Sequence, residues 1–279
     1  MNDIKQLQDI ATQVRRDIIR MIFASQSGHP GGSLGCADFM TTLYFNVMNA
    51  SPQTFTIDGN GQDMFFLSNG HIAPVWYSVL ARSGYFDVSE LGTLRKLHSK
   101  LQGHPTRYTN GVRIASGSLG QGLSVACGAA LAKKMNNDTN LVFTLHGDGE
   151  LQEGQIWEAA MFAAAKKIDN LIATVDYNGQ QIDGAVDNVV SLGDLAAKFT
   201  AFGWEVIQLN GNNIQQLVDG FAKAKSLTGK GKPIVILMKT EMGQGVDFMM
   251  GSHKWHGKAP NEEQTQQALS QLTETVGDY

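Results

Sequence analysis

The 279-residue sequence has few of the features that mark exported or membrane proteins. Its only cysteines, Cys36 and Cys127, lack the paired spacing of a metal or redox site, so free thiols in a reducing compartment are expected. There is no run of about 18 apolar residues, and the first residues lack the basic and apolar regions of a signal peptide. These absences predict a cytoplasmic protein without a membrane span.

An excess of positive charge and the common nucleotide-binding motifs are also missing. Acidic residues outnumber basic ones by 26 to 22, which argues against nucleic acid or an anionic membrane as the main partner. Neither G-x-x-x-x-G-K-[ST] nor G-x-G-x-x-G occurs, which argues against the usual nucleotide-binding enzymes. One G-x-S-x-G match, Gly31–Gly35, follows a predicted helix, whereas a nucleophile elbow follows a strand. A serine hydrolase is therefore not expected.

Short apolar segments alternate with helical patterns over most of the chain. An N-terminal helix is predicted to about Phe23, then a glycine-rich loop at 27–35 and a helix at 37–47. The predicted strands are Met64–Leu67, Leu141–Leu145, Leu171–Val175, Trp204–Leu209 and Pro233–Met238. Their alternation with helices predicts an α/β fold: a doubly wound, mainly parallel sheet with helices on both faces. No composition break divides the chain, so residues 1–279 are predicted to form a single domain.

Glycine is abundant, at 31 residues, and two predicted strands end in polar glycine turns. Asp148 lies in His146-Gly147-Asp148-Gly149, and Asn178 lies in Asp176-Tyr177-Asn178-Gly179. Because neighbouring parallel strands bring their carboxyl ends to one edge, Asp148 and Asn178 are expected to converge on one hard cation. Mg²⁺ or Ca²⁺ suits such ligands, with phosphate and water completing the shell. The alternative is ordinary Asp-Gly turn chemistry.

Five of the seven histidines adjoin a glycine: His29, His71, His104, His146 and His256. Histidines in several separate glycine-rich loops suggest a polar site for proton transfer or hydroxyl recognition. His98 and His253 lack this setting and are expected at the surface.

Taken together, these motifs resemble transketolase. The resemblance rests on Gly147–Gly154, on Asp176–Asn178, and on the loops at 27–32, 67–71, 103–105 and 182–184. It runs from about residue 7 to 260 and covers only the thiamine diphosphate-binding domain of that enzyme. The chain therefore resembles the N-terminal subunit of a split transketolase.

The resemblance implies a role for particular residues. Asp148 and Asn178 would bind Mg²⁺ through their side chains, and Gln180 through its carbonyl. The residues that would bind the cofactor are His71 and Gly149 beside the diphosphate, Gly117 and Leu119 beside the pyrimidine, and Ile182 and Met242 against the rings. Glu153 and Glu158 match the family's acidic pair, in which the first links two active sites and the second belongs to the cofactor-binding set. His29, His104 and His256 would surround the substrate, with His256 preferred to His253 on motif context.

The implied reaction moves a two-carbon ketol group from a ketose phosphate to an aldose phosphate, using thiamine diphosphate. The glutamate that contacts the pyrimidine belongs to a domain outside the resemblance. We therefore expect a C-terminal partner subunit, homodimer contacts, an α2β2 assembly and little activity without the partner.

Some positions depart from the family pattern. Thr106 follows Gly103-His104-Pro105 where an acidic residue is common, Asn212 and Asn213 replace a polar-Asp pair, and arginines are missing around Asp63. Three alternatives therefore stay open: a subunit of another thiamine diphosphate enzyme such as a split deoxyxylulose-phosphate synthase, a transketolase for an unusual sugar, or a non-catalytic partner subunit.

Overall fold

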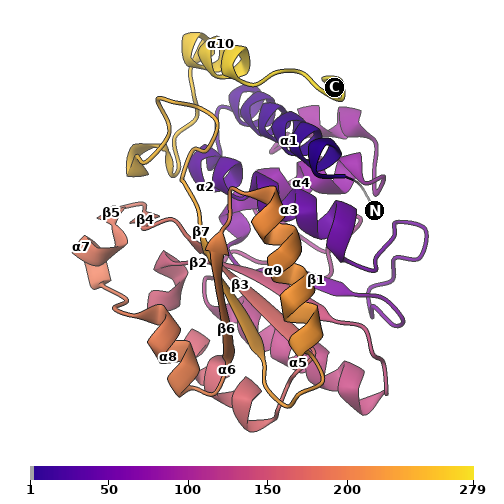
Figure 1. Ribbon diagram of the computed structural model, residues 1–279. Helices are drawn as coiled ribbons and strands as arrows, with labels where there is room; N and C mark the ends of the chain where they lie inside the picture. Colours follow the sequence, from indigo (N-terminus) through magenta and orange to yellow (C-terminus); the bar gives the residue numbers. More distant parts are fainter. Residues whose placement is uncertain (1–2) are drawn as a thin grey trace.

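The structure, a computed structural model, describes residues 3–279 (Figure 1). At its centre is a five-stranded sheet in the order β1-β2-β3-β7-β6, and every neighbouring pair is parallel. The strands are β1 (Met64–Leu67), β2 (Val142–Gly147), β3 (Leu171–Tyr177), β6 (Glu205–Asn210) and β7 (Ile234–Lys239). The predicted doubly wound α/β fold is confirmed, because strands alternate with helices along the chain.

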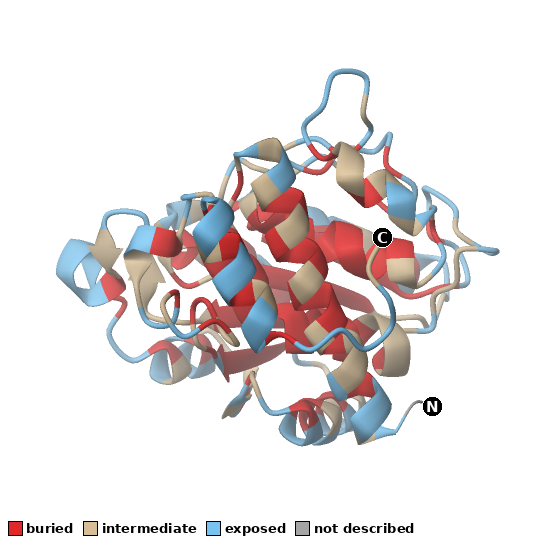
Figure 2. Ribbon diagram, turned by 90° about the horizontal axis from the view of Figure 1, so that it is seen from above, coloured by how far each residue is buried: buried red, intermediate tan, exposed pale blue. Residues whose placement is uncertain are grey.

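Helices cover both faces of the sheet because successive strand residues point to opposite sides. In β1, Phe65 and Leu67 enter one core while Met64 and Phe66 enter the other. The first core is closed by α1 (Ile4–Ser25), α3 (Ala37–Thr42), α4 (Ala73–Arg82) and α9 (Ile214–Leu227). The second is closed by α5 (Gln121–Met135), α6 (Gly154–Ala165) and α8 (Leu195–Ala201). Burial is accordingly greatest along the sheet and the inner helix faces (Figure 2).

The glycine-rich segment at 27–35 is not the loop that was predicted. It contains a short helix, α2 (Pro30–Gly35), whose glycines allow close packing. A Cβ on Gly31 would lie 2.6 Å from Cγ of Met242, and one on Gly35 would lie 2.9 Å from the Glu241 carbonyl oxygen. Glycine at 31 and 35 therefore serves helix packing rather than approach to a ligand. The helix predicted at 37–47 is α3 followed by a π-helical turn at Leu43–Val47.

Several elements lie outside the sequence predictions. Helix α4 is buried along nearly its whole length, so it lacks the exposed polar face of a surface helix. A hairpin, β4 (Gln180–Gln181) and β5 (Gly184–Ala185), leads into α7 (Val186–Val190). The other elements outside the predictions are 3₁₀ turns at Gly70–Ile72, Val88–Thr93, Gly149–Gln152 and His253–Trp255. In the polar C-terminal tail, where the sequence predicts a short helix, α10 (Glu262–Gln271) packs on α1. Within residues 3–279, no helix has the length and apolar character needed to cross a membrane.

Candidate functional site

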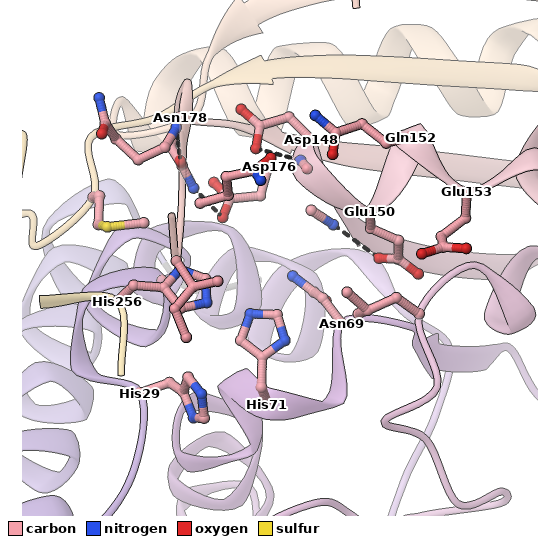
Figure 3. A pocket seen from close by; sticks show the side chains of 18 of the residues that line it. His29, Asn69, His71, Asp148, Glu150, Gln152, Glu153, Asp176, Asn178 and His256 are labelled. Atoms are coloured by element: carbon pink, nitrogen blue, oxygen red, sulfur yellow. Dashed lines mark hydrogen bonds between the residues drawn. The ribbon is translucent and has the colours of Figure 1, made fainter. Parts of the chain in front are cut away.

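A cavity of about 300 Å³ lies at the carboxyl edge of the sheet, beside the ends of β2 and β3 (Figure 3). Its walls come from the loops after β1, β2, β3 and β7, from the segment before α5, and from α2. The predicted site residues that line it are His29, His71, Gly117, Leu119, Asp148, Gly149, Glu153, Asn178, Gln180, Ile182, Met242 and His256. Loops that are distant in sequence thus meet where ligands bind in open α/β sheets.

Two predicted site residues lie outside this cavity. His104 is exposed and sits at the edge, where a Cβ on Gly117 would come within 2.9 Å of its Cδ2 atom. Glu158 is exposed on α6 and does not line the cavity. Of the two surface histidines predicted, His98 is exposed, whereas His253 is half-buried outside the cavity.

The suggestion that all five glycine-adjoining histidines form one polar site is wrong for His146. Its side chain is only 2% exposed and does not line the cavity. Its Nε2 atom lies 2.8 Å from the Thr144 hydroxyl, and its Nδ1 atom lies 3.6 Å from Glu150. His146 lies on β2, where its side chain is buried in the sheet although the next residue, Gly147, lines the cavity.

The Asp148 and Asn178 loops do come together. The Asp148 carboxylate accepts hydrogen bonds from the backbone amides of Gly179, at 2.5 Å, and Gly149, at 2.8 Å. Asn178 donates from Nδ2 to Asp176 at 2.9 Å, and its Oδ1 atom accepts from the Gln180 amide at 2.8 Å. A carboxylate and an amide oxygen therefore lie in adjoining turns, as the strand order predicts.

Two buried carboxylates at this edge have no basic side chain close enough to pair with them. Asp148 and Asp176 are 1% and 2% exposed, and within residues 3–279 neither forms an ion pair. Burial, and then the charge of Asp176, raise the pKa of Asp148 to about 7, and burial also raises the pKa of Asp176. A divalent cation would favour the ionised forms.

The donor set fits a hard cation that also binds phosphate. In the described part of the chain, no group of three or more His, Cys, Asp or Glu side chains could hold a metal ion. The expected set has one carboxylate, one amide oxygen and one backbone carbonyl, which leaves positions for phosphate oxygens and water, as is usual for Mg²⁺.

Three histidines face one another on the opposite side of the cavity (Figure 3). The ring centroids of His29 and His71 are 5.0 Å apart, those of His71 and His256 5.1 Å, and those of His29 and His256 5.5 Å. Burial, followed by repulsion from His256, lowers the pKa of His29 to about 4. Burial also lowers the pKa values of His71, His256 and the rim residue His104. These imidazoles are therefore neutral near pH 7 and able to donate or accept a proton.

Buried polar atoms around the cavity lack partners among the described residues. They include Nδ1 of His29, Oδ1 of Asn69, Oε1 of Gln181 and Nδ1 of His256. Buried polar groups are nearly always hydrogen-bonded in folded proteins. Their gathering beside one cavity indicates a site built for a polar ligand.

The cavity also contains residues that were not assigned a role from the sequence: Gly32, Asn69, Glu150, Gln152, Asp176 and Gln181. Asn69, Glu150 and Asp176 lie within the sequence motifs described above, and this position could have identified them as site residues. Burial opposes the ionisation of Glu150, but His146, the Ser68 hydroxyl and the Gly120 amide hold its pKa below the usual value. Glu150 is therefore a charged acceptor beneath the cavity.

Comparison with known proteins agrees with this geometry. The family model described as "Transketolase, thiamine diphosphate binding domain" matches residues 7–275. The chain is 36% identical over 262 residues to an apulose-4-phosphate transketolase subunit from Phocaeicola vulgatus, covering 94% of this chain and 92% of that one. It is 39% identical over 267 residues to the 6-deoxy-6-sulfo-D-fructose transketolase subunit SqwG of a Clostridium species, covering 95% and 96%. The crystal structure of transketolase from Campylobacter jejuni matches with a TM-score of 0.89 and 35% identity, over 97% of this chain but 43% of the enzyme.

Proposed function

Because the chain belongs to the transketolase family, as a thiamine diphosphate-binding domain, we propose that it is the diphosphate- and metal-binding subunit of a ketol-transferring enzyme. The observation that carries this proposal is one cavity with the paired turns of Asp148 and Asn178 on one side and three histidines on the other. We further propose that residues 1–279 act as one domain.

The cofactor would lie across the cavity. Asp148 and Asn178, through their side chains, and Gln180, through its carbonyl, would hold Mg²⁺, for which Ca²⁺ is a possible substitute. Two observations support this assignment of metal ligands: the two turns adjoin each other, and the buried carboxylates form no ion pair among the described residues. The other proposed cofactor contacts that line the cavity are Gly149 and His71 at the diphosphate, Gly117 and Leu119 at the pyrimidine, and Ile182 and Met242 at the rings. Thiamine diphosphate supplies the carbanion chemistry when bound.

The histidines would orient the sugar and move protons at its oxygen atoms. His29 and His256 are neutral at pH 7, and each has a buried Nδ1 atom that finds no partner within residues 3–279. The edge of each ring that carries Nδ1 would therefore hydrogen-bond to a carbonyl or hydroxyl group of the substrate. His104, at the edge of the cavity, would meet the sugar as it enters.

A partner subunit would complete the site. The chain spans 92% and 96% of two relatives named as transketolase subunits, but only 43% of a whole transketolase. Glu153 is exposed where it lines the cavity, and Met161 and Phe162 of α6 are 57% and 41% exposed. Such surfaces suit a subunit contact, so an α2β2 assembly with a pyrimidine-binding partner is proposed. Glu153 would then link the two active sites, and Glu158 would contact cofactor only in the assembly.

The substrates are proposed to be sugar phosphates, with xylulose 5-phosphate as donor and ribose 5-phosphate as acceptor, as in transketolase itself. A second candidate is a less common sugar, since the two relatives of similar length are named for apulose 4-phosphate and 6-deoxy-6-sulfo-D-fructose. Thr106, next to the His104-Pro105 pair, is a residue at which the two classes could be separated.

The test is ketol transfer by the purified chain with thiamine diphosphate and Mg²⁺, with and without its pyrimidine-binding partner. We expect turnover only in the mixture, with one of the two classes of sugar. Full turnover by the chain alone would contradict the two-subunit proposal, and failure of both sugar classes in the mixture would contradict ketol transfer.

A further inference from the structure

Helix α5 begins without a capping side chain of its own. Its N-cap residue is Gly120, with φ of 87°, and no side chain of that residue can accept from the first turn. The free amides of a helix N-terminus need acceptors from elsewhere. Two side chains supply them: the Gly120 amide donates to Oε1 of Glu150 at 2.8 Å, and the Gly122 amide donates to Oγ of Ser68 at 3.0 Å.

Glu150 and Ser68 also bind each other and a third loop. The Ser68 hydroxyl donates to Oε1 of Glu150, and the Gly147 amide donates to Oε2 at 3.0 Å. Glu150 and Ser68 are 2% and 1% exposed. One carboxylate thus accepts from three loops: the one after β1, the one before α5 and the one after β2 (Figure 3 shows the bond to the third).

Each of these loops leads directly into the cavity wall. Asn69 and His71 follow Ser68, Gly117 and Leu119 precede Gly120, and Asp148 and Gly149 follow Gly147; all six line the cavity. The carboxylate therefore sits where the three parts of the wall converge.

These segments pack so closely that glycine occupies two of their contact positions, Gly70 and Gly122. A Cβ on Gly70 would lie 2.8 Å from the carbonyl carbon of Ser116 and 3.0 Å from the amide nitrogen of Gly117. At Gly122 a Cβ would overlap the Ser68 side chain. With backbone against backbone, small movements of one loop are passed to the others, and the bonds to Glu150 set their relative positions.

We propose that Glu150, together with Ser68, is a positioning residue that holds the Gly117–Leu119 segment in register with the diphosphate loop. Both oxygens of Glu150 accept hydrogen bonds from these loops, so its action is assigned to their relative positions. The inference rests on the proposed function, because it assigns the Gly117–Leu119 segment to the pyrimidine end of thiamine diphosphate. A carboxylate can accept hydrogen bonds on both of its oxygens. In glutamine one of these oxygens is replaced by an NH₂ group, which would face a donor instead of accepting from it.

Variants of these two residues should affect affinity for the pyrimidine end of the cofactor more than affinity for its diphosphate end. Ser68→Ala removes the acceptor of the Gly122 amide and one donor to Glu150, both on the α5 side. It should weaken thiamine diphosphate about 5-fold to 10-fold, the usual worth of one hydrogen bond, while inorganic diphosphate binds within about 2-fold of wild type. Glu150→Gln also disturbs the Gly147 bond, so it should weaken thiamine diphosphate about 10-fold to 100-fold and inorganic diphosphate to a smaller degree.

The matched control is Asp63→Asn, at the opposite end of β1. Asp63 is 3% exposed and, like Glu150, accepts from two backbone amides: Asn49 at 2.8 Å and Leu141 at 2.7 Å. It lies outside the cavity lining. Its substitution should lower thermal stability without changing the affinity for either ligand.

The experiment is calorimetric titration of the four proteins, wild type and three variants, with thiamine diphosphate and with inorganic diphosphate, each in the presence of Mg²⁺. The expected result is a selective loss of thiamine diphosphate affinity in Ser68→Ala, a larger loss in Glu150→Gln, and none in Asp63→Asn. If wild type binds but the first two variants match Asp63→Asn, or lose both ligands equally, the positioning role is wrong while the proposed function stands. If wild type binds neither thiamine diphosphate nor inorganic diphosphate, the proposed function fails and this inference falls with it.

Discussion

At the amino-terminal edge of the sheet, buried charge is paired within the chain. Lys133 donates to the carbonyls of Gly59 and Gln62 at 2.8 and 2.9 Å and to Asp138 at 2.7 Å. Hydrogen bonds from Lys133 and Asn140 outweigh burial and hold the pKa of Asp138 well below its usual value. At the carboxyl edge, neither Asp148 nor Asp176 forms an ion pair with any of the described residues, and the pKa of Asp148 rises to about 7. The charges at the first edge are paired within the chain, whereas the two carboxylates at the second edge are left for the cation and polar ligand that we propose.

Removal of the proposed acidic metal ligand should have the largest effect at the carboxyl edge. Asp148→Ala should abolish Mg²⁺-dependent cofactor binding, a loss of about 10⁴-fold or several kcal/mol, because a charged ligand is lost from a site that must neutralise a diphosphate. Isothermal titration with thiamine diphosphate and Mg²⁺ measures it. Circular dichroism should show an intact fold, and wild-type affinity in the variant would mean that the metal lies elsewhere.

The histidine side of the cavity should affect turnover more than binding. His29→Ala, His104→Ala and His256→Ala should each lower kcat/KM by about 10²–10⁴, the usual worth of a positioned acid or base, when assayed with the partner subunit. Cofactor affinity should change much less. His98→Ala is the control, because His98 is exposed and does not line the cavity. Near-wild-type rates in all three variants would refute a role for these side chains in the reaction.

The amino edge should respond in the opposite sense. Lys133→Met leaves two carbonyls and the Asp138 carboxylate without their donor, so it should lower the free energy of unfolding by about 2–4 kcal/mol. Affinity for cofactor should stay within about 2-fold of wild type, since this edge only supports the sheet. Urea denaturation tests the loss of stability, and the same titration tests the unchanged affinity. A large loss of affinity with unchanged stability would contradict the structural role assigned to this edge.

The smallest effect concerns acid sensitivity. The pKa of His29 is about 4 in the folded chain against about 6.5 unfolded, so the unfolded state binds the proton first. Its contribution to stability is therefore complete above pH 6.5 and is lost as the pH falls toward 4. In His29→Asn, the free energy of unfolding should depend less steeply on pH between pH 4 and 6.5. The change in slope should be smaller than that for binding one proton, because the His29 side chain is partly exposed. The opposite contribution of Asp148 is present in both proteins and cancels. Equal slopes would show that His29 titrates normally.

Much of the fold could be predicted from the sequence, because it depends on local patterns. Segments such as Leu171–Val175 are apolar apart from Thr174, as is typical of strands buried on both faces, and their carboxyl ends carry the polar turns. Helix α4 escaped prediction because it is buried on nearly all sides, and α2 because glycine normally disfavours a helix. Local rules cannot see the tertiary packing that stabilises both.

The candidate site was predictable to the extent that it lies in loops after strands. Asp148 and Asn178 follow neighbouring strands, so the strand order brings them together. Glu150 has partners at Ser68, Gly120 and Gly147, and no sequence pattern reveals that these loops meet. For the same reason His146 looked like a site residue although its side chain is buried in the sheet.

The central claim is that the carboxyl edge of this chain holds a metal-bridged diphosphate. Titration of the purified chain with inorganic diphosphate, in Mg²⁺ and then in EDTA, tests it most directly, because this probe needs only the end of the cavity that the chain itself provides. The account predicts saturable binding in Mg²⁺ that is lost in EDTA and in Asp148→Ala but kept in Asp63→Asn. Binding that is indifferent to EDTA, or absent in Mg²⁺, would contradict it.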